Sequence, residues 1–527
     1  MNKPVSLDHI LAAVVSGLLL AAAFPNWNQT YLLFVALIPL YWAVPGKSLS
    51  AAFGLGLLNG LAQNLVMFYW IVYVTHVFGY LPLPVSLGIL LLLAGYLSLY
   101  RGLWAWGISW GAAQGLSPVW WGPVLWVTLE FGQTYIISGF PWELLGNGLV
   151  PYPPLLQVAD VTGVYGLSFL VALSNACLWR LLSPPRARRR RSRHYPYAVA
   201  VCLILAAWLG YGYYRLGQVQ KLEARSPKLK VAVVQGNIKQ GEKWQKEMVQ
   251  ATLDRYAELT RRVPGAQLII WPETAAPFFF LRTPDLSAQV QAIAKESGAP
   301  LLFGAPAWEL ISGEERYFNR AYLLSPQGEV LGYYDKAHLV PYGEYVPLRD
   351  FRPFAFLGEI WPGVGDFRPF AFISKMVPMV GDFAEGPVGA TISLPDDGAL
   401  GPLICYESIF PYLSRAQVQN GAKLLINITN DAWFGKTAAA SQHLAMAVLR
   451  CVENRVCLAR AANTGISAFI DARGRILWQS ELFVPEAHAL ELPLMSGNTL
   501  YTRYGDLFAW ACLILTGLAL IFARRRR

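Results

Sequence analysis

The sequence predicts a polytopic α-helical membrane domain, of about eight transmembrane helices, that carries a polar α/β domain with a buried sheet. Three observations predict this fold class: the composition, a series of long apolar runs, and one long polar stretch before the last run. The 527 residues are 55% hydrophobic and only 14% charged, with a mean hydropathy of +0.36. These values lie outside the range of ordinary soluble domains, so the composition excludes a purely soluble protein.

The apolar runs are long enough to cross a bilayer, which takes roughly 17 to 25 residues of helix. Eight can be read, at residues 8–24, 28–45, 51–74, 85–110, 118–137, 161–182, 195–214 and 506–523. More apolar sequence follows the first run, without a small-residue cleavage pattern and a polar mature domain, so we expect a retained helix there. The resulting division is a membrane domain at 1–215, a polar domain at 216–500, and a last helix with a basic tail at 501–527.

Arginine clusters predict the orientation. Six lie between the sixth and seventh runs (Arg186, Arg188, Arg189, Arg190, Arg191 and Arg193) and four end the chain (Arg524, Arg525, Arg526 and Arg527), which together match the formal net charge of +10. Short loops rich in Lys and Arg stay in the cytoplasm. With eight crossings, both termini are therefore expected inside and the polar domain outside, in the periplasm if the chain lies in a bacterial inner membrane. Because the basic charge is explained by topology, we predict no nucleic-acid partner.

Three of the six cysteines fall within apolar runs, where a thiol is an ordinary small apolar residue: Cys177, Cys202 and Cys512. The other three, Cys405, Cys451 and Cys457, lie in the polar domain. Residues six apart on one helix face away from each other, so we expect no Cys451–Cys457 disulfide and no disulfide framework. An unpaired cysteine in an oxidising compartment needs another reason, and catalysis by Cys405 is one.

The polar domain alternates short β-type runs with helical ones. Strands are expected at Leu229–Gln235, Leu268–Trp271, Pro300–Gly304, Ala321–Ser325, Leu403–Cys405, Leu424–Thr429 and Ser467–Asp471, and helices at Glu242–Arg262, Leu286–Glu296 and Ser441–Arg460. In the helical segments apolar residues recur three and four positions apart. This alternation predicts a layered α/β domain.

Three polar residues, Glu273, Lys336 and Cys405, stand at the ends of predicted strands. A thiol with its ordinary pKa near 8.5 needs a base or a nearby cation to react as a thiolate at neutral pH. A glutamate can take the thiol proton and later that of an attacking amine, while a lysine and a backbone N–H hold an oxyanion, at roughly 3–4 kcal/mol per donor. Spacing alone does not single out this trio, because any domain of this size contains Glu, Lys and Cys.

The motifs around the trio carry a resemblance. Trp271-Pro272-Glu273, Tyr334-Asp335-Lys336-Ala337-His338 and Leu403-Ile404-Cys405-Tyr406-Glu407 resemble the Glu, Lys and Cys motifs of the nitrilase superfamily. The whole chain resembles the apolipoprotein N-acyltransferase family, the membrane-embedded branch of that superfamily. Further matching segments are Ser138-Gly139-Phe140-Pro141-Trp142, Val234-Gln235-Gly236-Asn237-Ile238 and Asn430-Asp431-Ala432-Trp433-Phe434-Gly435-Lys436. The resemblance implies a nitrilase-like αββα sandwich inserted between helices seven and eight.

The family resemblance also implies a ping-pong acyl transfer. Cys405 would attack an acyl ester of a phospholipid and hold the chain as a thioester, which the α-amino group of the N-terminal diacylglyceryl-cysteine of an apolipoprotein resolves. Carried over by position, Glu273 is the base, Lys336 the electrostatic stabiliser and Cys405 the nucleophile. Trp244, Glu344, Tyr406 and Glu407 match supporting or substrate-binding positions. We expect no cofactor, no metal and a monomer.

Several of these residues have a structural alternative. Trp244 is also suited to anchoring a helix start, and Glu344 to a solvated loop, although beside a lysine it would orient or neutralise the site. Tyr406 and Glu407 can support the site without taking part in the reaction. His338 and His443 lack metal-ligand spacing, so we expect packing or hydrogen bonding.

Two charged residues fall within membrane runs, where ionisable groups are costly and often functional: Arg101 in the fourth and Glu130 in the fifth. Arg101 is expected to extend toward the cytoplasmic surface and Glu130 to hydrogen-bond within the bundle. A role in lipid-headgroup binding or helix pairing is the alternative for both.

A tandem duplication departs from the family pattern, which has one such unit. The seven residues at 350–356 recur at 366–372, and Asp382-Phe383 follows at the same 16-residue interval. Because aromatic residues gather at membrane interfaces, we expect this loop and Pro277-Phe278-Phe279-Phe280-Leu281 to form apolar lids beside Cys405. Ordinary packing onto the domain is the alternative.

Two other functions use the same features. A membrane-anchored nitrilase-type amidase or hydrolase would use the trio with water as the second nucleophile. A transporter would use the helices, but the eight runs show no convincing internal symmetry of the kind that transporters have.

Overall fold

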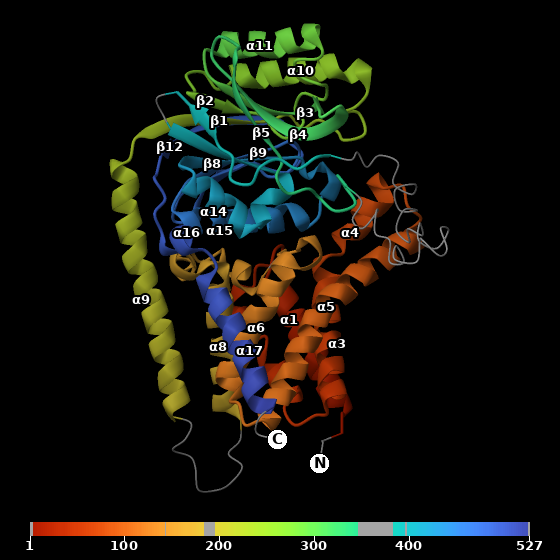
Figure 1. Cartoon of the computed structure of the whole chain (residues 1–527), viewed down its shortest axis with the longest axis vertical. Coiled ribbons are helices and arrows are strands. Elements are labelled where there is room, and N and C mark those ends of the chain that lie inside the picture. The colour runs from red at the N-terminus through yellow and green to blue at the C-terminus, as the bar shows by residue number, and fades with distance from the viewer. Residues whose placement is uncertain (1–3, 143, 184–194, 346–382, 396–397, 525–527) are drawn as a thin grey trace.

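The structure is a computed structural model that describes residues 4–142, 144–183, 195–345, 383–395 and 398–524. Apolar helices form a bundle at one end of the molecule, and two stacked sheets with their own helices lie at the other (Figure 1). The bundle and the segments that join it contain α1 Leu7–Ala22, α2 Ile38–Ala43, α3 Leu49–Met67, α4 Trp70–Tyr73, α5 Leu83–Ala113, α6 Pro118–Tyr135, α7 Pro153–Leu156, α8 Ala159–Leu182, α9 Tyr195–Arg225 and α17 Leu507–Arg524. Within the described residues, four helical segments are long and apolar enough to cross a membrane: Leu49–Met67, Leu83–Ala113, Ala159–Leu182 and Val199–Arg225.

The second predicted run, 28–45, is not one helix. It forms a 3₁₀ turn at Thr30–Phe34 followed by the short α2. Pro39 lies in the first turn of α2, the only part of a helix that tolerates the missing N–H of proline without losing a hydrogen bond. The run is therefore interrupted because Pro39 favours the start of a new helix over the continuation of the preceding turn. Each of the other seven predicted runs contains at least one of the helices given above.

The second part of the molecule is built on two six-stranded sheets. Their strands are β1 Lys228–Gln235, β2 Leu268–Ile270, β3 Leu301–Ile311, β4 Glu314–Leu324, β5 Val330–Asp335, β6 Ile392–Leu394, β7 Gly398–Ile404, β8 Ala422–Thr429, β9 Cys457–Ala462, β10 Ala468–Ile470, β11 Ile476–Gln479 and β12 Glu486–Pro493. The strand orders are β12-β1-β2-β3-β4-β5 and β11-β10-β9-β8-β7-β6. The layered α/β prediction is confirmed, and the two sheets agree with the αββα sandwich that the family resemblance implies.

Helices cover both outer faces of the stacked sheets. α10 Lys246–Arg261 and α11 Pro284–Ser297 lie over the first sheet, whereas α14 Pro411–Gln419 and α15 Ala439–Asn454 lie between the second sheet and the bundle (Figure 1). The central strands β7, β8 and β9 run parallel, and β8 is buried along nearly its whole length, as parallel strands covered on both faces require. The layers therefore follow the order α, β, β, α, with the last helical layer seated on the bundle.

The helix predicted at Ser441–Arg460 is wrong at its C-terminal end. α15 stops at Asn454 because Arg455 takes a left-handed backbone conformation, with φ of 54°, and β9 begins at Cys457. Cys451 and Cys457 thus lie in different elements, so the argument that placed them on one helix does not hold. All six cysteines are free.

The expected aromatic lid at 277–281 is wrong for two of its phenylalanines. Phe278 and Phe280 are buried in the core beneath α10 and α11, where Phe280 packs edge-on against Phe303 at 5.0 Å. Leu281 is exposed. The duplicated loop at 350–381, the other predicted lid, lies outside the described residues.

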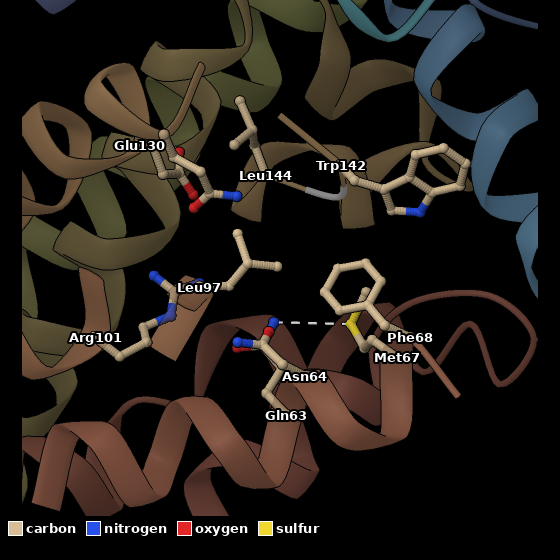
Figure 2. A pocket seen from close by; sticks show the side chains of 10 residues that line it. Gln63, Asn64, Met67, Phe68, Leu97, Arg101, Glu130, Trp142 and Leu144 are labelled. Atoms are coloured by element: carbon tan, nitrogen blue, oxygen red, sulfur yellow. Dashed lines mark hydrogen bonds between the residues drawn. The ribbon is translucent and has the colours of Figure 1, made fainter. Parts of the chain in front are cut away.

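Arg101 and Glu130 line one small polar cavity inside the bundle (Figure 2). Glu130 Oε1 accepts hydrogen bonds from Trp126 Nε1 and from the backbone N–H of Leu145, each at 2.8 Å. The guanidinium of Arg101 lies 3.7 Å from the centre of the Trp126 ring. The hydrogen-bonding interpretation of Glu130 is confirmed, whereas Arg101 faces this interior cavity and not the cytoplasmic surface.

Candidate active site

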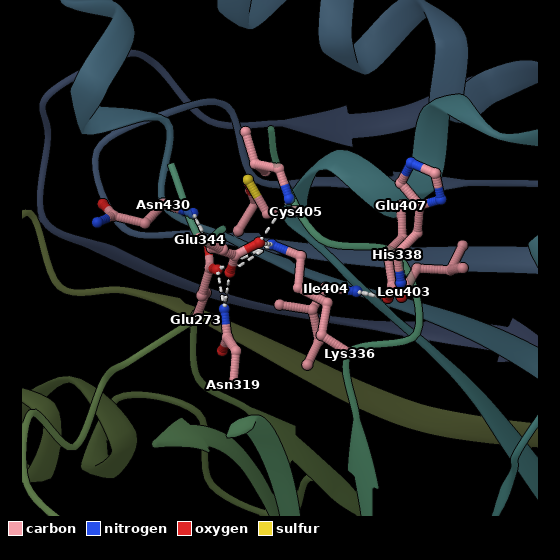
Figure 3. Close-up of polar contacts among 12 residues, drawn as sticks. Glu273, Asn319, Lys336, His338, Glu344, Leu403, Ile404, Cys405, Glu407 and Asn430 are labelled. Carbon is pink, nitrogen blue, oxygen red and sulfur yellow. Dashed lines mark hydrogen bonds and ion pairs between the residues drawn. The ribbon is translucent and has the colours of Figure 1, made fainter. Parts of the chain in front are cut away.

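Glu273, Lys336 and Cys405 are brought together from three strands. Glu273 follows β2, Lys336 follows β5, and Cys405 follows β7 in the other sheet. Figure 3 shows Glu273 and Lys336 converging with Glu344 in one polar cluster beside the Cys405 side chain. The site therefore lies where the two sheets face each other, and neither sheet could form it alone.

The carboxylate of Glu273 is buried and held from two sides. Oε1 accepts from Asn319 Nδ2 at 2.7 Å, and Oε2 accepts from the backbone N–H of Asn430 at 3.0 Å. Lys336 Nζ lies 3.7 Å from Oε1. These contacts fix the carboxylate in place without neutralising it, which suits a general base.

Lys336 is almost completely buried, with 1% of its surface exposed. Its ammonium donates to Glu344 at 2.9 Å and lies close to Glu273. Burial alone would lower the pKa of Lys336, but the charges of Glu344 and Glu273 outweigh it and raise the pKa above its ordinary value. Lys336 therefore stays cationic and can stabilise negative charge on a sulfur or an oxygen next to it.

Cys405 begins a 3₁₀ turn directly after β7 and has a left-handed backbone, with φ of 52°. Burial raises the pKa of its thiol, the carboxylate of Glu273 raises it further, and Lys336 opposes them. The resting residue is therefore a protonated thiol. It becomes a strong nucleophile only when a base such as Glu273 takes its proton as the new bond forms.

Glu344 is not a solvated loop carboxylate, since its side chain is only 12% exposed. Its Oε1 accepts from Lys336 and, at 2.8 Å, from Asn319 Nδ2, while Oε2 accepts from the backbone N–H of Val340. Asn319 thus donates to the carboxylates of both Glu273 and Glu344. Sequence reasoning missed Asn319, which stands within β4 and belongs to none of the recognised motifs.

Glu407 is fully buried and serves the backbone around the site. Oε1 accepts from Tyr334 OH at 2.9 Å and from the N–H groups of Ala337 and His338 at 2.6 and 3.0 Å, and Oε2 accepts from Ile404 N–H at 2.7 Å. Burial raises the pKa of Glu407 to about 7, although the hydrogen bonds from Ile404, Tyr334 and Ala337 and the charge of Lys336 act in the other direction. Glu407 therefore ties the Lys336 segment to the Cys405 turn and does not face the reacting atoms.

Tyr406 points toward the bundle. Its hydroxyl donates to the backbone carbonyl of Gly139 at 3.3 Å, and its ring packs against Phe410 with ring centres 5.1 Å apart. Gly139 belongs to the predicted motif 138–142, which thereby contacts the residue next to Cys405. Tyr406 supports the site from the membrane side.

Trp244 is not brought into the charged cluster. Its side chain is 51% exposed and lines a largely apolar cavity of about 1150 Å³. Other residues along this cavity are Pro277, Phe278, Phe279, Pro306, Tyr317 and Phe383. Tyr317 stands two residues before Asn319 on β4, so the two side chains share one face of the strand. The cavity therefore borders the face of β4 on which Asn319 also lies.

Lys243, the neighbour of Trp244, is a second buried lysine that sequence reasoning missed. It is 2% exposed, and its Nζ donates to the backbone carbonyl of Glu273 at 3.0 Å. Burial lowers the pKa of Lys243 to about 8, although Glu273 and Cys405 act in the other direction. The sequence shows that Lys243 directly precedes Trp244, but a single sequence does not indicate that the Lys243 side chain points into the domain.

The two histidines pack and hydrogen-bond, as predicted. His338 stacks near Phe410, with ring centres 3.9 Å apart, and its Nδ1 lies 3.0 Å from Tyr412 OH. His443 is fully buried and lies 3.0 Å from the Cys405 carbonyl oxygen. In the part of the chain that the structure describes, no group of three or more His, Cys, Asp or Glu side chains could hold a metal ion.

Comparison with known proteins places this geometry in a family. Residues 16–177 match the model of the apolipoprotein N-acyltransferase N-terminal domain, and residues 230–486 match that of carbon-nitrogen hydrolases. An amidase from Nesterenkonia sp. is similar in structure, with 21% identity, a TM-score of 0.38, and coverage of 55% of this chain and 97% of that one.

Two curated relatives cover nearly the whole chain. The apolipoprotein N-acyltransferase of Geobacter metallireducens is 41% identical over 98% of this chain and 95% of its own length. That of Methylococcus capsulatus is 32% identical over 99% of this chain and 97% of its own length. Both matches extend over the helical bundle and the two-sheet domain. The chain therefore belongs to the apolipoprotein N-acyltransferase family.

Proposed function

We propose that this protein transfers an acyl chain from a membrane phospholipid, through a thioester on Cys405, to the α-amino group of the N-terminal diacylglyceryl-cysteine of apolipoproteins. The observation that carries the proposal is the cluster at the sheet interface, where a thiol at a sharp turn lies beside a lysine and a held carboxylate (Figure 3). Family membership supplies the substrate classes.

In the first half-reaction Glu273 takes the Cys405 proton while the sulfur attacks the ester carbonyl of the phospholipid. The ammonium of Lys336 stabilises the negative charge of the tetrahedral intermediate. Collapse breaks the ester C–O bond, and Glu273 returns the proton to the departing lysophospholipid oxygen. The acyl chain remains on the sulfur as a thioester, and the base is ionised again.

In the second half-reaction the amine of the apolipoprotein attacks the thioester carbonyl. Glu273 removes a proton from the attacking nitrogen, the C–S bond breaks, and the proton returns to the Cys405 sulfur. The amide product leaves with all charges restored. Glu273 is thus a carboxylate at the start and end of each half-reaction, and Cys405 returns to the protonated thiol only after both half-reactions are complete.

The apolar cavity beside Trp244 is proposed to receive acyl chains. Its lining is mostly aromatic and proline carbon, and it borders the face of β4 on which Asn319 also lies. Its volume of about 1150 Å³ lies slightly above the range of ordinary small-molecule pockets, which is roughly 300–1000 Å³, so it has room for a long ligand. Trp244 is therefore assigned to substrate binding, whereas Glu344, Tyr406 and Glu407 are assigned to support of the site.

For the membrane arrangement we propose eight crossings in a bacterial inner membrane, with residues 216–500 as the periplasmic domain and a monomeric chain. The arginine clusters support cytoplasmic termini. Figure 1 adds support, because both ends of the chain lie at the end of the bundle away from the sheets. The short α2 is the crossing that departs most from a continuous helix.

The decisive experiment measures intact mass after incubation with phospholipid alone. The wild type is expected to gain one acyl mass that hydroxylamine removes, and Cys405→Ser is expected to gain none. Lasting acylation also separates the transferase from a membrane-anchored hydrolase, which would release free fatty acid without an amine acceptor. An acyl adduct that persists in Cys405→Ser would refute the assignment of the nucleophile.

A further inference from the structure

A buried polar group lies behind the nucleophile and takes no part in the proposed reaction. It consists of His443 on α15, Asp431 after β8, and Arg460 on β9, none of which exposes more than 1% of its surface. Arg460 Nη2 donates to Asp431 Oδ2 at 2.7 Å and lies 3.0 Å from His443 Nδ1. Burying an ion pair costs free energy of desolvation unless its polar atoms are hydrogen-bonded in the interior. Such a buried group is therefore expected to have a structural or functional role.

The free edge of the His443 ring faces the turn that carries Cys405. Nε2 lies 3.0 Å from the Cys405 carbonyl oxygen and 2.9 Å from Ser408 Oγ, and Ser408 Oγ itself donates to the same carbonyl at 3.2 Å. Cys405 is the residue whose φ of 52° makes the turn. A non-glycine residue in this region is held there by its surroundings, because the conformation is unfavourable by itself.

Two partners face Nδ1: the Arg460 guanidinium, which only donates, and Asp431 Oδ1, which only accepts. The Cys405 carbonyl oxygen beside Nε2 also only accepts, so a hydrogen bond between them requires the proton on Nε2, and Arg460 then donates to the Nδ1 lone pair. Burial and the Arg460 charge lower the pKa of His443, which favours this neutral form. Asp431 Oδ1, 3.1 Å from Nδ1, pairs with the ring when both nitrogens carry a proton, and Nε2 remains a donor then as well.

The bundle presses on the same histidine from the other side. The Trp142 ring lies 5.7 Å from the His443 ring, and Trp142 Nε1 donates to Gln442 Oε1 at 2.9 Å. Gln442 also accepts from Trp70 Nε1 at 3.1 Å and donates to the backbone carbonyl of Met67. Adjacent residues on α15 thus contact the membrane helices and the nucleophile turn.

From this geometry we infer that His443 is a positioning residue: it donates from Nε2 to the Cys405 carbonyl and holds the nucleophile turn in its left-handed conformation. Asp431 and Arg460 orient the ring, and Trp142 fixes its position from the membrane side. The inference rests on the proposed role of Cys405 as the nucleophile. Without the donor, the sulfur would shift relative to Glu273 and Lys336, and a displacement of about 1 Å can slow a reaction on the order of a hundredfold.

The test compares His443→Leu and His443→Gln with the wild type. Acyl-enzyme formation from phosphatidylethanolamine in detergent is followed by intact mass, and Cys405 alkylation by iodoacetamide is followed in parallel. His443→Leu is expected to form the acyl-enzyme on the order of a hundredfold more slowly, with kcat reduced and KM little changed. His443→Gln is expected to recover at least a tenth of the wild-type rate, because its amide can still donate to the carbonyl.

Alkylation distinguishes positioning from a general loss of structure, because a small alkylating reagent needs an ionised thiol but no alignment of the sulfur with the ester of a bound phospholipid. It is expected to change much less than acylation in both variants. His488, which stacks on Trp478 at a sheet edge, supplies the matched controls His488→Leu and His488→Gln, which should acylate at the wild-type rate.

Two results would overturn the inference: wild-type acylation by His443→Leu, or a folded His443→Gln that is no faster than His443→Leu. If His443→Leu does not fold, the comparison of His443→Gln with the wild type decides, and a loss greater than a hundredfold in a folded protein counts against it. If the wild type itself forms no Cys405 thioester, the proposed function fails, which is a different result.

Discussion

At the scale of single residues, the site balances two carboxylates against two buried lysines. Glu273 and Glu344 share the Lys336 ammonium and the Asn319 amide, while Lys243 caps the backbone carbonyl of Glu273. The Lys336 ammonium lies between the two carboxylates, 3.7 Å from Glu273 Oε1 and 2.9 Å from Glu344 Oε2, so its positive charge offsets their mutual repulsion. The thiol is left protonated, so that negative charge forms on sulfur only during the reaction.

Replacing Lys336 by Met is expected to make the Cys405 thiol harder to ionise. Lys336 lowers the pKa of this thiol against burial and Glu273, so its removal raises that pKa. The rate of iodoacetamide alkylation at a fixed alkaline pH should then fall, and the pH profile should move to higher pH. Lys295→Met, at an exposed position on α11, should leave the profile unchanged. If folded Lys336→Met has the same pH profile of alkylation as the wild type, Lys336 does not stabilise the Cys405 thiolate.

Asn319→Leu tests the bridge between the carboxylates. The substitution removes donors from Glu273 and Glu344 at once, and a hydrogen bond to a charged group is worth about 1.5–3 kcal/mol. Acyl-enzyme formation, followed by intact mass, should slow by about tenfold to a hundredfold. Asn498→Leu, at an exposed position where the amide oxygen accepts from Arg503, is the control and should react at the wild-type rate. Equal rates in both variants would show that the bridge is dispensable.

The trio was predicted at this scale because short motifs surround it, whereas the groups that hold it were not. Asn319, Lys243 and His443 each meet the site through a fold contact from a distant part of the chain. A single sequence gives the residue types but not the direction in which a strand or loop turns them. The predicted supporting residues divide accordingly: Glu344 lies next to Lys336, and Glu407 lies beneath the Cys405 turn.

At the scale of elements, the site depends on two strand ends in different sheets that are joined by Glu407. Its carboxylate accepts from backbone N–H groups that follow β5 and from the last residue of β7. In Glu407→Gln the amide group would face one of these donors, and leaving a buried donor unsatisfied costs about 1–3 kcal/mol. The apparent Tm in detergent should fall, as should acyl-enzyme formation. Glu491→Gln, at an exposed position on β12, is the control and should change neither the apparent Tm nor acyl-enzyme formation. A wild-type Tm for Glu407→Gln would show that Glu407 is not needed to hold the ends of β5 and β7 together.

Element predictions were correct where periodicity and length agreed, and failed where one residue changed the chain direction. Arg455 ended a helix that the apolar pattern continued to 460, and Pro39 divided an apolar run that hydropathy read as one. β5, β6, β11 and β12 were not predicted: β6 has only three residues, and much of the surface of the other three is half-buried or exposed. An alternating sequence pattern indicates a strand that buries one face, and these strands do not have one consistently buried face.

At the scale of the whole molecule, a buried ion cluster joins the bundle to the two-sheet domain. Asp160 on α8 accepts from Tyr211 and Arg215 on α9, at 2.7 Å each, and from Arg455 at the end of α15 at 2.8 Å. Removing one partner of a buried ion pair costs about 3–5 kcal/mol. Asp160→Asn should therefore lower the apparent Tm and expose the junction to limited proteolysis, which Asp285→Asn at the surface of α11 should not do. Unchanged proteolysis would mean that packing alone holds the two parts together.

The proposed orientation of the chain in the membrane predicts which introduced cysteines can be labelled from outside the cell. If α1 and the divided second run form a pair of crossings, residue 29 lies in the periplasm and residue 50 in the cytoplasm; both positions are exposed. In a Cys405→Ser background, a membrane-impermeant maleimide added to cells with a permeabilised outer membrane should label Gln29→Cys and Lys295→Cys but not Ser50→Cys. Lysis should make Ser50→Cys reactive, which controls for access. Labelling of Ser50→Cys before lysis would show that the short α2 does not return the chain across the membrane, and an odd number of crossings would follow.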